Sequence, residues 1–81
     1  MPSTQSYPAV VEKIITDGKH GAYVVARSEV LGTVTFSLNS KVWSEEDQPE
    51  AGTQVMLSQV RKKRAGWRAM KARFFEPGDE Q

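Results

Sequence analysis

AYVVARSEVLGTVTFSL, residues 22–38, contains two short runs of β-branched and aromatic residues separated by the turn-forming residues 28–32. In the second run apolar residues alternate with hydroxyl residues, namely Val34, Phe36 and Leu38 with Thr33, Thr35 and Ser37. A strand places successive side chains on opposite faces, so this period of two indicates a strand with one buried face. The segment predicts a β-hairpin with strands at residues 22–27 and 33–38.

The same combination of strand formers and turn formers recurs on both sides of this hairpin. Residues 9–16 (AVVEKIIT) predict an earlier strand, which ends at the turn-prone Asp17-Gly18-Lys19-His20-Gly21. Residues 53–60 (TQVMLSQV) predict a fourth strand, residues 66–75 (GWRAMKARFF) a fifth, and residues 62–66 the turn between them. No stretch shows three turns of helical periodicity, so the sequence predicts an all-β chain.

Five short strands joined by glycine-containing turns suggest a small closed or nearly closed barrel. The polar connection between the third and fourth strands, residues 39–52, is about 14 residues long, enough to have a function or to carry a helical turn. We therefore expect a five-stranded, OB-fold-like antiparallel barrel at residues 7–76. Strand count alone leaves an SH3-like barrel open. The polar ends, residues 1–6 and 77–81, have compositions that favour disorder.

Composition excludes several classes of function. A chain of 81 residues forms one domain, and without cysteine and with one histidine it has neither disulfides nor the usual zinc ligands, so we expect no cofactor or metal. The consecutive acids at residues 45–47 lack the spacing of a calcium loop. No P-loop, dinucleotide fingerprint or nucleophile motif is present, so we expect a protein that is not an enzyme. No signal peptide or membrane-spanning apolar stretch is evident, which predicts a soluble, cytoplasmic monomer.

Charge is strongly segregated along the chain. Residues 1–57 contain four bases and seven acids, residues 58–75 contain seven bases and no acid, and residues 76–81 contain three acids. The overall charge of +1 therefore hides a local excess of +7. In the segment at residues 59–75 these cations are interleaved with aromatic side chains, the combination that holds a phosphate backbone and stacks on bases.

Four segments resemble, in their order and spacing, the motifs of cold-shock domains. Residues 18–24 (GKHGAYV) resemble the first RNA-binding motif of that family, and residues 33–37 (TVTFS) resemble the second. Residues 50–55 (EAGTQV) resemble the entry into its fourth strand, and residues 66–72 (GWRAMKA) resemble its final strand. This resemblance implies an OB-fold and nucleic-acid binding through the exposed face of the barrel.

The chain departs from the family at the positions that stack on bases. Only Tyr23 occupies an aromatic position of the first motif, since Gly21 stands where another aromatic residue is expected. Thr33 and Thr35 stand where the second motif usually has a phenylalanine and a histidine. A looser similarity is to the group that includes bacterial translation initiation factor one and the repeat domains of the largest small-subunit ribosomal protein. That similarity implies RNA binding, with the ribosome or another ribonucleoprotein as one setting.

The candidate nucleic-acid-binding residues come from two segments. In the first, Lys19, His20 and Arg27 are expected to flank the ligand and Tyr23 to stack on a base. In the second, cations are expected to neutralise phosphates: Arg61, Lys62, Lys63, Arg64, Arg68, Lys71 and Arg73. Trp67 either stacks on a base or closes the barrel core.

Three other aromatic positions have expected structural roles. Trp43 is expected to cover one end of the barrel, because it lies in an acidic connection that disfavours phosphate. Phe36 is expected in the core. Phe74 and Phe75 are adjacent and must point to opposite faces of a strand, so at most one is buried in the barrel.

The sequence leaves two classes of function. The first is binding of RNA or single-stranded DNA with low sequence specificity, through the basic and aromatic face. The second is a protein-interaction module whose basic hairpin docks on an acidic partner and whose barrel edge pairs with a partner strand.

Overall fold

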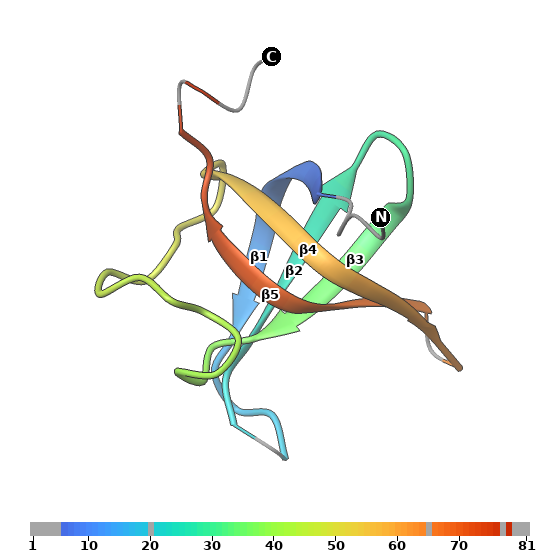
Figure 1. Cartoon of the computed structure of the whole chain (residues 1–81). Helices are drawn as coiled ribbons and strands as arrows, with labels where there is room; N and C mark the ends of the chain where they lie inside the picture. Colours follow the sequence, from blue (N-terminus) through green and yellow to red (C-terminus); the bar gives the residue numbers. More distant parts are fainter. Residues whose placement is uncertain (1–5, 20, 65, 77, 79–81) are drawn as a thin grey trace.

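The computed structural model describes residues 6–19, 21–64, 66–76 and 78. Within these residues the chain is all-β, with five strands that close into one barrel (Figure 1). The strands are β1 (Ser6–Ile15), β2 (Tyr23–Ser28), β3 (Gly32–Ser37), β4 (Gln54–Lys63) and β5 (Gly66–Phe74). The predicted five-stranded, OB-fold-like barrel is confirmed.

The barrel closes in the order β1-β2-β3-β5-β4, and β4 pairs with β1 to complete the ring. The pairs β1–β2, β1–β4, β2–β3 and β4–β5 are antiparallel, whereas β3 and β5 are parallel. The parallel contact has only two register pairs, Val34 with Trp67 and Thr35 with Arg68. Each described strand therefore has a neighbour on both sides.

Alternating side chains from all five strands fill the interior. Val24 and Ala26 of β2, Val34 and Phe36 of β3, and Leu57 of β4 are fully buried. The small residues Ala69 and Ala72 fill the buried positions of β5. The period of two in residues 33–38 thus identified Val34 and Phe36 of β3 correctly as core-facing.

Trp43, which the sequence predicts at one end of the barrel, is a buried member of the core cluster. Its ring stacks on Phe36 with centroids 5.7 Å apart and meets Phe74 edge-on at 4.9 Å. The indole Nε1 donates a 2.7 Å hydrogen bond to the carbonyl oxygen of Asp47. The side chain is only 4% exposed, so its polar group is satisfied inside the fold. Trp43 therefore joins its connection to the core.

The same connection extends the barrel wall where β3 and β5 separate. The amide of Ala72 donates to the carbonyl of Val42 at 2.9 Å, and the amide of Ser44 donates to the carbonyl of Ala72 at 3.4 Å. Turns centred on Asn39 hold this segment, because the Asn39 carbonyl accepts bonds from the amides of Val42 and Trp43. The connection contains turns and no helix within its described residues.

Two strand boundaries differ from the prediction by three residues, and the others by one residue at most. β4 continues past Val60 to Lys63, so the β4–β5 hairpin is longer and its turn shorter than expected (Figure 1). β1 begins at Ser6 and contains Pro8, which lacks the amide that a central strand needs. Pro8 is tolerated because it pairs with Met56 of β4 only, since the pairing of β1 with β2 starts at Ala9.

Replacing Trp43 by alanine should lower the free energy of unfolding by about 3–5 kcal/mol, because it removes the ring that packs between Phe36 and Phe74. Urea unfolding followed by circular dichroism measures this loss. The matched control is Val30→Ala, since Val30 is 73% exposed and its truncation should change stability by less than about 0.5 kcal/mol. Equal effects of the two substitutions would contradict the role given to Trp43.

Candidate functional site

Outward-facing side chains of four neighbouring strands form one continuous row across the barrel. Val25 of β2 pairs with Thr35 of β3, Thr35 pairs with Arg68 of β5, and Arg68 pairs with Arg61 of β4. Residues directly opposite each other in a sheet share a face, so these side chains lie side by side. Tyr23, two residues before Val25, shares that face on β2. We call the surface formed by Tyr23, Thr35, Arg61 and Arg68 the basic face.

Two arginines stand directly opposite each other on this face. Arg61 and Arg68 are register partners of β4 and β5, both are exposed, and neither has an ion-pair partner within the described residues. Like charges in directly opposed positions destabilise a strand pair. An anion placed between the two guanidinium groups would relieve this repulsion. The arrangement therefore favours a negatively charged ligand.

The end of the β4–β5 hairpin carries further cations. The ammonium group of Lys62 lies 5.8 Å from the centroid of the Trp67 ring, within cation–π range. Trp67 is half-buried and packs against the core. Of the two roles expected for Trp67, stacking on a base and closing the barrel core, this packing favours the second. Lys63 and Arg64 are exposed beside the turn.

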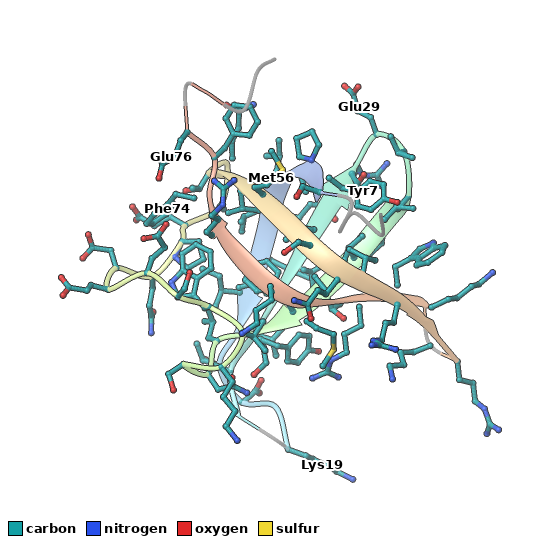
Figure 2. The ribbon with its side chains drawn as sticks, viewed as in Figure 1. Tyr7, Lys19, Glu29, Met56, Phe74 and Glu76 are labelled. Carbon is teal, nitrogen blue, oxygen red and sulfur yellow. The ribbon has the colours of Figure 1, made fainter. Side chains whose placement is uncertain are left out.

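A pocket of about 300 Å³ opens next to the basic face, at the start of β2. It is lined by Gly18, Lys19, Gly21, Ala22, Tyr23, Thr35, Ser37 and Arg68. Arg68 and Thr35 belong to both the pocket and the row of outward-facing side chains, so the two features form one surface. Lys19 lies at the far end of the turn between β1 and β2 (Figure 2).

The Tyr23 ring packs closely on the backbone of that turn. A Cβ atom added to Gly18 would lie 3.1 and 3.2 Å from two ring carbons of Tyr23 and 2.7 Å from the carbonyl oxygen of Gly21. Only glycine leaves this space free. The turn therefore fixes the ring at the pocket wall before any ligand binds, which lowers the entropy cost of stacking.

The structure brings together only part of the predicted site. Lys19, Tyr23 and Arg68 line one pocket, and Arg61 lies next to Arg68. His20 lies outside the described residues. Lys62, Lys63 and Arg64 extend from the same hairpin as Arg61.

Three predicted cations lie elsewhere. Arg27 forms an ion pair with Glu12 at 3.2 Å, and Arg27 and Arg73 both line a larger hollow of about 810 Å³ that also contains the exposed side chains of Val10 and Val30. Lys71 donates a 2.9 Å hydrogen bond from Nζ to the carbonyl oxygen of Lys41.

The prediction missed five residues that line the pocket. The sequence places Thr35 and Ser37 on the polar face of a strand, Gly18 and Gly21 in a turn, and Ala22 at the start of the second strand. Strand alternation could have placed Thr35 and Ser37 on the same face as Tyr23 once the pairing of β2 with β3 was known. The tight contact of Gly18 with an aromatic ring has no sequence signal.

Acidic side chains gather on a different part of the barrel. Glu46, Asp47 and Glu50 are exposed on the connection before β4, and Glu45 accepts a 3.1 Å hydrogen bond from the amide of Phe74. In Figure 2 oxygen-tipped side chains cluster along this connection, whereas nitrogen-tipped side chains cluster along the β4–β5 hairpin. No group of three or more histidine, aspartate or glutamate side chains in the described part of the chain could hold a metal ion.

Comparison with known proteins gives no relative: no protein-family model, curated protein or solved structure matches the chain. Among the residues described by the structure, no helix is long and apolar enough to cross a membrane.

Removing one member of the arginine pair should stabilise the fold. We expect Arg61→Thr to raise the free energy of unfolding by about 0.2–1 kcal/mol at low salt, because Arg68 then faces a neutral side chain. At about 1 M salt the gain should disappear, since the Debye length falls to roughly 3 Å. Lys63→Thr is the matched control, because Lys63 faces Gly66, which has no side chain. A salt-dependent gain of the same size in the control would contradict the repulsion.

Gly18→Ala should disturb both the turn and the Tyr23 ring. The added methyl group meets the Gly21 carbonyl and the ring at distances that cannot be accommodated without movement. We expect a loss of about 1–3 kcal/mol in stability, as for other overpacked sites, and shifted ring resonances of Tyr23 by NMR. Gly78→Ala serves as a control, since nothing lies within 4 Å of the Cβ position there. Unchanged Tyr23 resonances would disprove the contact.

Proposed function

We propose that this protein binds single-stranded nucleic acid, RNA or DNA, through the basic face, as a binding protein without catalytic activity. The observation that carries the proposal is the unrelieved pair Arg61 and Arg68 directly beside the pocket that contains Tyr23. A single strand offers both phosphates for the guanidinium groups and exposed bases for the ring. Most phosphate contacts carry no sequence information, so we infer low sequence specificity.

The shape of the barrel is compatible with this proposal. In OB-folds the surface of the second and third strands and the loops that join strands one to two and four to five bind oligonucleotides. Here Tyr23 and Thr35 lie on those strands, Lys19 lies in the first of those loops, and Arg64 lies in the second. This similarity of fold supports the position of the ligand-binding face. The kind of ligand is inferred from the chemistry of the side chains on that face.

The distribution of charge also supports a polyanionic ligand. Lys63, two residues after Arg61, and Arg64 in the turn extend the positive charge beyond the barrel wall, while the exposed acids lie on the connection before β4. Such a separation attracts a phosphate backbone to one side and repels it from the other. A setting within a ribonucleoprotein, where other contacts add affinity, would suit the small number of stacking residues.

The second class of function is a protein-interaction module. Of its two expected contacts, docking of the basic hairpin fits the closed barrel better than pairing with a partner strand. Each of the described strands has neighbours on both sides, so addition of a partner strand would require the barrel to open. Docking of the hairpin on an acidic protein surface needs no such opening. A pull-down with and without nuclease distinguishes the two classes, because nuclease should remove a partner that is held through nucleic acid.

Fluorescence anisotropy with a short labelled oligonucleotide of mixed sequence, at several salt concentrations, tests the proposal. If about four cations engage the strand, log K should fall with log salt with a slope of roughly −3. Arg68→Gln should weaken binding and reduce the magnitude of the slope by about 0.7. Lys41→Gln removes one exposed charge from the connection before β4, outside the basic face, and should change neither quantity.

Two results would refute nucleic-acid binding. One is no binding at low salt. The other is binding that does not depend on salt, since contacts to phosphates always release counterions.

A further inference from the structure

The pocket beside the basic face combines three kinds of chemical group. Tyr23 supplies an aromatic ring, Lys19 and Arg68 supply positive charge, and Thr35 and Ser37 supply hydroxyl groups. A phosphate ion alone would use only the cations. A nucleotide would use all three, because it has a flat base, polar groups along the edge of that base, and a phosphate.

The hydroxyl groups of Thr35 and Ser37 can each form a further hydrogen bond with a ligand. The Ser37 Oγ accepts two hydrogen bonds from Asn39, from the backbone amide at 3.3 Å and from Nδ2 at 3.0 Å. A serine hydroxyl has two acceptor positions and one hydrogen, so the hydrogen of Ser37 remains to be donated. The Thr35 hydroxyl makes no hydrogen bond to another described residue. Both groups lie at the wall of the pocket.

The size and the rigidity of the pocket also fit one nucleotide. Its volume of about 300 Å³ lies at the lower end of the range for small-molecule sites. Gly18 lets the turn pack against the Tyr23 ring, which holds the ring in place. A base still paired in a duplex could not enter, because its edge would be hydrogen-bonded to the opposite strand.

We propose that this pocket is a subsite for one unpaired nucleotide within a bound strand. The base stacks on Tyr23 with its polar edge toward the hydroxyl groups of Thr35 and Ser37, and a neighbouring phosphate lies on Arg68. This proposal rests on the proposed function and deepens it, because it divides the interface into a phosphate-binding part, Arg61 and Arg68, and a base-binding part.

The test compares two labelled ligands of about eight nucleotides, a length within the site size of an OB-fold. One is a single-stranded DNA of mixed sequence and the other is its abasic counterpart, which has the same phosphates and no bases. Wild-type protein should bind the abasic strand more weakly. Tyr23→Leu should lose roughly 5- to 150-fold in affinity for the normal strand and little for the abasic strand.

Two more variants separate the parts of the subsite. Thr35→Val keeps the shape of the side chain without the hydroxyl, and should lower affinity for the normal strand roughly 2- to 12-fold without changing the salt slope. Arg68→Gln should weaken both ligands and reduce the slope. Tyr23→Phe keeps the ring and its packing on Gly18, and should bind like the wild type. Circular dichroism confirms that each variant is folded.

The outcomes distinguish this proposal from the proposed function. If Tyr23→Leu lowers affinity only for the strand that has bases, the base subsite is supported. If it lowers affinity equally for both ligands, or for neither, the subsite is disproved while salt-dependent binding through Arg61 and Arg68 stands. If neither ligand binds wild-type protein at low salt, both proposals fail.

Discussion

The short parallel contact between β3 and β5 is the constraint on which the rest of the structure depends. It joins the two halves of the barrel through only two register pairs, Val34 with Trp67 and Thr35 with Arg68. The first pair directs its side chains toward the core, and the second directs its side chains outward. Closure of the barrel and assembly of the basic face are therefore produced by the same contact, and neither exists without the other.

Closure of the barrel also requires a change in which residues of β4 and β5 face the core. The alternation of inward-facing and outward-facing residues shifts by one position partway along both strands. Val55 and Leu57 face the core in the first half of β4, whereas in the second half Val60 packs against it. Gln59, which lies between them, has a φ of 52°, an uncommon conformation for a residue other than glycine. β5 shows the same change, from Ala72 to Ala69. This shift turns the hairpin so that its outer side carries Arg61 and Arg68.

Much of the fold was predictable because its signals are local. Alternation in residues 33–38 gave the buried face of β3, and turn-forming residues gave the order of the five strands. The length of β4 was less predictable, because Arg61, Lys62 and Lys63 resemble turn residues in their polarity. They continue the strand because β5 provides hydrogen-bonding partners for them up to Gly66.

The candidate site was less predictable than the fold because it depends on register. Arg68 and Arg73 lie five residues apart, near opposite ends of β5, so they contribute to different parts of the barrel surface. Arg73 pairs with Met56 near the opposite end of the barrel, where it lines the hollow that also contains Arg27. The sequence also gives no sign that Arg61 and Arg68 are directly opposite each other, because the two residues are seven positions apart and their pairing depends on the register of β4 and β5.

The alternation along β3 has a consequence for how this protein can change over evolutionary time. The side chains of Val34 and Phe36 are buried in the core, whereas those of Thr33 and Thr35 face outward. Substitutions at the outer positions would therefore change the surface that the proposed ligand contacts and leave the packing of the core intact. The barrel can in this way keep its architecture while the chemistry of its outer surface varies.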